Sequence, residues 1–225
     1  DIEYAKTLKI EIVPLKVIID GKDYKDRIDL QPSNFYELLE KSSVLPTTSQ
    51  PSPQDFLDLY EDAKNQGDSI IVITLSSQVS GTYQSACIAK DLADYNNIYV
   101  IDSFNATQGL RLIVEKAVKL RNEGKSVQEI VNIIEEYKHR VHILAVVDTL
   151  EYFYKGGRLS KTSATMGTLL KFKPIVGLED GKLVLISKAR GTQKAISKII
   201  DIIHEIGDID LNEPICIGYT GNDDG

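Results

Sequence analysis

The sequence has no tryptophan, only two cysteines and no long apolar segment. A transmembrane helix needs about 20 consecutive apolar residues, and no stretch of this chain approaches that length, so we expect no stable membrane insertion. The first residues also lack a signal-peptide pattern. Cys87 and Cys216 lie in amphipathic or apolar runs rather than in a disulfide framework. That usage is typical of reduced cysteines, and we expect a cytoplasmic protein.

Basic charge is also scarce relative to acidic charge. The formal net charge is -7 and the isoelectric point is near 5.1. Nucleic acids and anionic membranes attract surfaces rich in lysine and arginine. We therefore expect no nucleic-acid partner, while small local basic sites stay open.

Several cofactor and catalytic motifs are missing. There is no Walker A sequence and no Gly-x-Gly-x-x-Gly after a strand, so nucleotide binding has no local support. No Cys/His cluster has zinc spacing, and we expect neither a metal nor a cofactor. His139, His142 and His204 have no catalytic spacing, and no Gly-x-Ser-x-Gly elbow is present. We assign no catalytic residue.

What is present is an alternation of strand and helix patterns over the middle of the chain. Apolar runs of strand length cover residues 69–77, 97–103 and 141–148, and helical patterns cover 81–95, 109–124 and 126–139. Continuous apolar strands are typical of a sheet covered on both faces. Their alternation with helices predicts parallel strands with right-handed crossovers.

The composition changes after Asp148, and we place a domain boundary there. Residues 1–148 are expected to form an N-terminal α/β domain with a Rossmann-like parallel sheet, and residues 149–225 a C-terminal α/β domain. The second domain is predicted to hold two strands joined at Asp180-Gly181, a helix over 192–206 and a strand over 214–221.

The first part of the chain carries local start and stop signals. Alternating apolar residues over 9–20 predict a strand disturbed at Pro14, which cannot donate a ladder hydrogen bond. A capping residue, Asn34, predicts the start of a short helix. Ser52, which a proline and an aspartate follow, predicts a second helix start, and Gly67 predicts its end.

Hydroxyl and glycine residues gather where predicted strands lead into helices. They are Thr47, Thr48, Ser49, Ser76, Ser77, Ser80, Gly81, Thr82, Ser103 and Thr149, and two other polar residues, Asn105 and Asp148, lie among them. Ligands of open α/β sheets bind at this edge, and hydroxyls suit uncharged hydrogen bonds to a carboxylate or phosphate. The alternative interpretation is that they are helix caps and turn residues, which is the commoner role for any single serine or threonine.

Two arginines follow breaks in the pattern. Arg158 comes directly after a double glycine, and Arg190 lies near the end of a predicted strand. Each could reach an anion or an acidic partner. A helix end followed by a solvated arginine explains the first position equally well.

Six motifs occur in order along nearly the whole chain. They are "PTTSQPSPQDF", "LSSQVSGTYQSA", "IDSFNATQGL", "LEYFYKGGRLS", "LLKFKPIVGLEDGKL" and "KARGTQKA". In combination they resemble the DegV family, the fatty-acid-binding proteins of bacterial fatty acid kinase. The resemblance implies a two-domain α/β fold with a long-chain fatty acid, of the palmitate, stearate or oleate class, between the domains and its tail in an apolar tunnel.

The resemblance also implies a carboxylate site. Thr48 and Ser80 match the hydroxyl residues that hold the fatty-acid carboxylate in the family. Ser49 and Gly81 are expected to shape that site, and Arg158 to place a positive charge near it.

A partner is implied as well. Arg190 matches an arginine that we expect to face the catalytic subunit of fatty acid kinase, which has a DAK-like domain. The protein would carry the fatty acid and its acyl phosphate, with transient membrane contact for lipid exchange. The resemblance also implies a first strand and a C-terminal segment, and their motifs are not among these 225 residues.

Two other functions stay open. A serine-dependent acyl or lipid hydrolase would use Ser80 as its nucleophile and would need a base beside it. A lipid-sensing regulatory module would share the pocket of a carrier and differ only in its partner.

Overall fold

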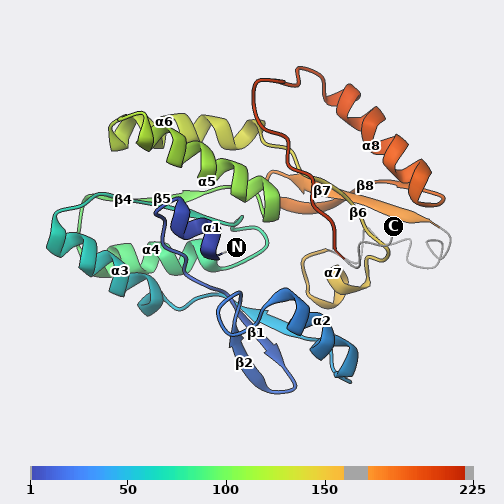
Figure 1. Cartoon of the computed structure of the whole chain (residues 1–225), viewed down its shortest axis with the longest axis horizontal. Helices are drawn as coiled ribbons and strands as arrows, with labels where there is room; N and C mark the ends of the chain where they lie inside the picture. The colour runs from blue at the N-terminus through green and yellow to red at the C-terminus, as the bar shows by residue number, and fades with distance from the viewer. Residues whose placement is uncertain (1, 160–171, 221–225) are drawn as a thin grey trace. The chain divides into compact units, whose positions relative to one another are not determined.

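The computed structural model describes residues 2–159 and 172–220 (Figure 1). These residues form two compact units. Unit 1 comprises Asp1–Val72 and Ser80–Ile101, and unit 2 comprises Ile73–Val79 and Asp102–Gly225. The boundary expected after Asp148 stays a prediction. Ser160, the last residue of "LEYFYKGGRLS", lies outside the described residues, as do Leu169, Leu170 and Lys171 of the fifth motif.

Helices and short strands alternate along the first half of the chain. In order they are α1 (Ile2–Thr7), β1 (Lys16–Ile19), β2 (Lys22–Lys25), α2 (Pro32–Lys41), β3 (Thr47–Ser49), α3 (Pro53–Gln66), β4 (Ile70–Thr74), α4 (Thr82–Ala93) and β5 (Ile98–Asp102).

A small antiparallel sheet with the order β2-β1-β3 lies in unit 1. The strand expected over 9–20 begins only at Lys16, two residues after Pro14, which has no N–H to donate to a ladder. Sequence reasoning missed β2. It returns through a tight turn at Asp20 and Gly21, whose φ angles of 49° and 77° lie in the left-handed region.

Capping decides where α2 and α3 begin. α2 starts at Pro32, two residues before the expected Asn34, since proline suits the first helical position. The predicted start of α3 is confirmed: Ser52 accepts a hydrogen bond from the Asp55 backbone N–H, and the Asp55 carboxylate accepts one from the Ser52 N–H. The hydrogen bonds from Ser52 hold the pKa of Asp55 below its ordinary value. The helix ends at Gly67, as predicted.

The main core of unit 1 lies between α3 and α4, which run side by side in Figure 1. Phe56 and Tyr60 of α3 pack against the alanines of α4 and against Ile98 of β5. Tyr60 is only 1% exposed, and its hydroxyl donates to the Ala86 carbonyl oxygen at 3.4 Å. Burial raises the pKa of the Tyr60 phenol. Alanines on α4 let the two helices approach closely.

Strands β4 and β5 pair in parallel, as their apolar runs predict. The N–H of Ile70 donates to the Asn97 carbonyl oxygen at 2.9 Å at one end. The N–H of Ser103 donates to the Thr74 carbonyl oxygen at 3.2 Å at the other. Both strands therefore finish at one edge, where the chain leads into the hydroxyl-rich loops.

The second half of the chain supplies the remaining elements. In order they are α5 (Thr107–Asn122), α6 (Val127–Tyr137), the 3-10 helix η1 (Lys138–Arg140), β6 (Leu144–Val146), α7 (Glu151–Lys155), β7 (Lys173–Glu179), β8 (Lys182–Ala189) and α8 (Thr192–Ile206). The predicted starts of α6 and α8 are confirmed, as is the turn at Asp180-Gly181.

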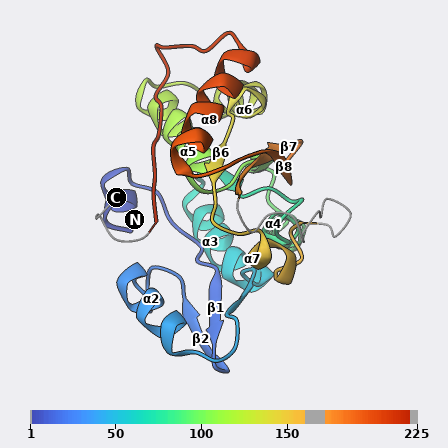
Figure 2. The same cartoon turned by 90° about the vertical axis from the view of Figure 1, so that its right-hand side faces the viewer.

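The placement of the third apolar strand was wrong. β6 does not continue the parallel sheet but pairs antiparallel with β7 in a sheet ordered β6-β7-β8. One face of this sheet packs on α8 through Leu144 and Val146, and the other packs on α7 through Ala145 and Val147 (Figure 2). A strand covered on both faces reads as a continuous apolar run in either kind of sheet.

The strand expected over 214–221 does not form among the described residues 214–220. Instead, the residue directly before this segment, Glu213, is held by side-chain contacts. Glu213 pairs with Lys116 of α5 and accepts a hydrogen bond from the Tyr137 hydroxyl at 3.3 Å. Ile217, which was expected inside a sheet, is 91% exposed. An apolar run becomes a strand only where a neighbouring strand pairs with it.

Replacing Ser52 with alanine is expected to lower the free energy of unfolding by about 1 kcal/mol, because the cap of α3 loses its acceptor. Urea denaturation followed by circular dichroism measures this. Ser43→Ala, at an exposed serine without a cap, is the matched control. Equal midpoints for the Ser52 and Ser43 variants would contradict the capping role.

Tyr137 provides a pH prediction. Burial, followed by the nearby Glu213 carboxylate, raises the pKa of Tyr137 to about 12. The folded state therefore keeps a proton that the unfolded state loses above its ordinary pKa near 10, so this contribution to stability is present below pH 10 and is lost as the pH rises toward 12. In Tyr137→Phe the free energy of unfolding should fall less steeply between pH 9 and 11 than in the wild type. Parallel curves would refute the assignment.

Candidate functional site

Thr48 and Ser49 lie on β3, immediately before the cap of α3. Thr48 is paired with Val17 and Ser49 with Lys16 across the antiparallel ladder. The Thr48 side chain is exposed, and its hydroxyl has no hydrogen-bond partner among the described residues. Pairing with β1 thus fixes the backbone while the hydroxyl stays available to a ligand.

Ser80 lies in the loop that precedes α4. Its hydroxyl is 2.8 Å from the Thr82 hydroxyl and accepts a hydrogen bond from the Thr82 N–H at 3.3 Å. Ser80 is half-buried. These local hydrogen bonds hold the Ser80 oxygen at the amino end of a helix, where unpaired N–H groups favour negative charge.

Gln50 brings these two segments of unit 1 together, and sequence reasoning did not select it. Its side-chain N–H donates to the Ser85 hydroxyl on α4 at 3.3 Å. A Cβ on Gly81 would lie 2.2 Å from the Gln50 amide oxygen, so only glycine leaves room for this amide. The sequence offers one signal, a polar residue between Ser49 and Pro51 in a stretch with restricted backbone angles.

Other hydroxyls at the strand ends have structural partners. The Ser76 hydroxyl donates to the Gly181 carbonyl oxygen at 2.8 Å, and Ser103 donates to the Asn105 carbonyl oxygen at 3.1 Å. The Asp102 carboxylate accepts the N–H of Ser77 at 3.1 Å. The alternative interpretation, caps and turns, therefore accounts for these residues.

Arg158 lies in unit 2, just after α7. The double glycine ends that helix, and Gly157 adopts a φ of 74°. The Arg158 Nε donates to the carbonyl oxygen of Val79 at 3.1 Å, and its Nη1 donates to the Gly156 carbonyl oxygen. The guanidinium thus holds the backbone of Val79, which directly precedes Ser80 in the sequence.

Arg190 follows β8 and is exposed. Its guanidinium carbon lies 5.5 Å from the centre of the Phe172 ring, and the Lys188 ammonium lies at the same distance from that ring. Two positive charges therefore lie beside one aromatic ring.

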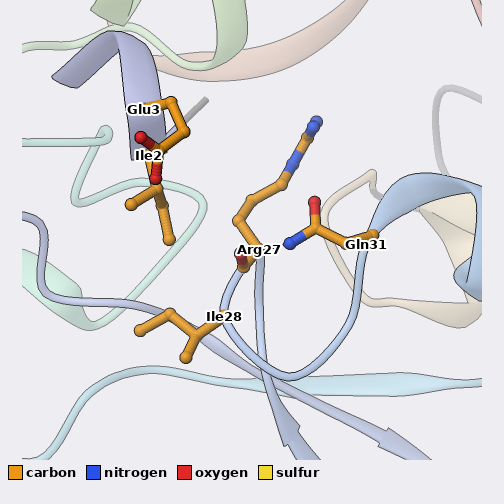
Figure 3. A pocket seen from close by; sticks show the side chains of 5 residues that line it. All are labelled: Ile2, Glu3, Arg27, Ile28 and Gln31. Carbon is orange, nitrogen blue, oxygen red and sulfur yellow. Dashed lines mark hydrogen bonds between the residues drawn. The ribbon is translucent and has the colours of Figure 1, made fainter. Parts of the chain in front are cut away.

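A surface pocket of about 460 Å³ lies elsewhere in unit 1 (Figure 3). It is lined by Ile2, Glu3, Arg27, Ile28 and Gln31. The Gln31 side chain donates to the Arg27 carbonyl oxygen at 2.7 Å. None of the six expected site residues lines this pocket.

Residues 2–159 and 172–220 contain no group of three or more His, Cys, Asp or Glu side chains that could hold a metal ion. Within the same ranges, no helix is both long and apolar enough to cross a membrane. Cys87 and Cys216 are free thiols. His139 packs on Phe104, with 5.4 Å between the ring centroids.

The helices and the parallel and antiparallel strand pairs define an α/β protein. Comparison with known proteins gives the family. The family model described as "Uncharacterised protein, DegV family" matches residues 1–225. A DegV domain-containing protein of Caldanaerobacter subterraneus subsp. tengcongensis is 46% identical over 211 residues, which cover 94% of this chain and 75% of the relative. The chain belongs to the DegV family, and the predicted resemblance is confirmed.

Solved structures agree in fold. "Fatty Acid Binding of a DegV family Protein from Thermus thermophilus" has a TM-score of 0.83 and 32% identity, covering 91% of this chain and 73% of that one. DegV of Bacillus subtilis, described as a fatty acid binding protein, has a TM-score of 0.79 and 36% identity, with the same coverage. A stearic acid-binding protein from Eubacterium ventriosum has a TM-score of 0.80 and 28% identity, covering 91% and 72%. The predicted α/β fold class is confirmed.

Proposed function

We propose that this protein binds one long-chain fatty acid and presents its carboxylate to a separate ATP-dependent fatty acid kinase. The observation that carries the proposal is the free hydroxyl of Thr48 in a segment that contacts the Ser80 loop through Gln50. DegV structures described as fatty-acid-binding, with 28–36% identity to this chain, support the ligand class.

Hydroxyl groups suit the head of this ligand. Thr48 and Ser80 donate to the carboxylate oxygens, and Ser49 and Gly81 shape the site. A charge from Arg158 near the carboxylate stays an expectation of the family motif; within unit 2 its Nε donates to the Val79 carbonyl oxygen. A carboxylate held by hydroxyls, rather than by a bidentate arginine, keeps an oxygen available to attack the γ-phosphorus of ATP on the kinase, with ADP leaving.

The acyl tail supplies most of the affinity. Burying a methylene is worth about 0.8 kcal/mol, so a chain of palmitate length gains far more from its tail than from its head. In unit 2, Leu183 and Leu185 of β8 are half-buried and pack with Tyr154 and Val147 against one core cluster. The Tyr154 hydroxyl is buried without a partner among the described residues.

The hydrolase alternative gains no support. Among the described residues, no histidine, aspartate or glutamate forms a hydrogen bond with Ser80, whose partner is Thr82. A serine nucleophile needs such a base to become reactive. A lipid-sensing module would differ from a carrier only in its partner. A pull-down from lysate would distinguish the two.

Organic extraction of the purified protein followed by mass spectrometry should reveal a bound fatty acid, or the protein should bind added palmitate. Thr48→Ala and Ser80→Ala should each weaken palmitate binding about tenfold to 100-fold, because each removes a hydrogen bond to a charged group. Fluorescence displacement of a fatty-acid probe measures the affinity.

Thr47→Ala is the matched control, since neighbouring residues of a strand point to opposite faces and Thr47 is also exposed. It should bind palmitate like the wild type. A wild-type protein that yields no acyl chain and binds neither palmitate nor oleate would contradict the proposed function.

Arg190→Ala should leave palmitate affinity unchanged and weaken capture of the kinase subunit, because the Phe172 cluster loses one of its two charges. Surface plasmon resonance with the immobilised catalytic subunit of fatty acid kinase measures this affinity. Lys182→Ala, at the opposite end of β8, is the control. Equal binding by the two variants would remove Arg190 from the partner surface.

A further inference from the structure

Two motifs of the proposed site meet at one side chain. Gln50 follows Thr48 and Ser49 on β3, and its amide lies against Gly81 and Ser85 at the first turn of α4. The residues in contact are 31 and 35 positions away in the sequence. All of them belong to unit 1.

The backbone on each side of this contact is held independently. Thr48 is fixed by pairing with β1, and the buried Pro51 follows Gln50 directly. On the other side, the Ser85 N–H donates to the Gly81 carbonyl oxygen at 3.0 Å, and Ser85 is 3% exposed. The Gln50 amide therefore connects two rigid segments rather than two mobile ones.

The missing Cβ of Gly81 sets how closely these segments approach. An added Cβ would lie 2.2 Å from Oε1 and 2.6 Å from both Cδ and Nε2 of Gln50. The φ of Gly81 is -77°, which alanine adopts without strain. Glycine at this position thus leaves room for the Gln50 amide, and the backbone conformation does not demand it.

We propose that Gln50 is a positioning residue: its amide, seated on Gly81 and bonded to Ser85, sets the separation between the Thr48 and Ser80 hydroxyls so that both reach one carboxylate. This inference rests on the proposed function and adds to it a residue that determines head-group specificity. Gln50 acts on the ligand through the two hydroxyl segments.

The role predicts a specific dependence on the ligand head. Gln50→Ala should weaken palmitate binding about threefold to tenfold, the effect of one hydrogen bond. Hexadecanol has a tail of the same length, but a single protein hydroxyl can satisfy its head group. Gln50→Ala should therefore change the affinity for hexadecanol less than about twofold. A purely structural role would weaken both ligands equally.

Gly81→Ala supplies a second route to the same result, because its Cβ displaces the flexible end of Gln50 and leaves the backbone in place. It should match Gln50→Ala in palmitate affinity. The double variant should bind no more weakly than either single variant, since the amide is already lost. Gln54→Ala, another glutamine whose amide bonds a neighbour on an exposed helix face, is the matched control.

The experiment is a competition titration of palmitate and hexadecanol on the full chain and the four variants, with thermal denaturation of each. We expect Gln50→Ala and Gly81→Ala to lose affinity for palmitate but not for hexadecanol, with an unchanged melting temperature. The loss in the double variant should equal that in each single variant. Unchanged palmitate affinity in Gln50→Ala, equal losses for both ligands, or multiplied losses in the double variant would overturn the positioning role. A wild type that binds neither ligand would instead overturn the proposed function itself.

Discussion

The side-chain amide of Gln50 lies against α4 only because Gly81 has no Cβ. This steric constraint joins a three-residue strand to the start of a helix far along the chain. The strand is itself held by pairing with β1, and the helix packs its alanines on α3. The proposed hydroxyl site needs such support, because each hydrogen bond contributes little unless donor and acceptor are already in place.

Several polar groups at the strand ends form hydrogen bonds within the protein. This reduces the number of residues that can be proposed to bind a ligand. Ser76 holds the Gly181 turn, and Asp102 holds the backbone of Ser77. Thr48 differs, since its backbone is paired while its hydroxyl has no partner among the described residues. Burial explains this difference. A buried polar group needs a hydrogen-bond partner inside the protein, whereas an exposed hydroxyl can bond water or a ligand.

Local signals in the sequence predicted local structure well. Ser52 and Gly67 marked helix ends because caps and left-handed positions depend on one or two residues. Sheet membership was predicted less well. β6 was assigned to the wrong sheet and residues 214–220 to a strand, because apolar runs report burial or β-propensity but not which strand lies alongside.

The candidate site shows the same limit. Thr48 and Ser80 were chosen through the family motifs, whereas Gln50 was overlooked because its importance lies in a contact with Gly81 that no local pattern reports. Arg158 was expected as a charge near the ligand, and the structure adds that it donates to the Val79 carbonyl oxygen. Long-range contacts of this kind become visible only once the chain is folded.

The most direct test of the lipid site is a crystal structure of the protein with palmitate. The account predicts one carboxylate with its oxygens about 2.5–3.0 Å from the hydroxyl oxygens of both Thr48 and Ser80. A carboxylate bound away from these two residues, for example in the surface pocket lined by Arg27 and Gln31, would contradict the proposed site.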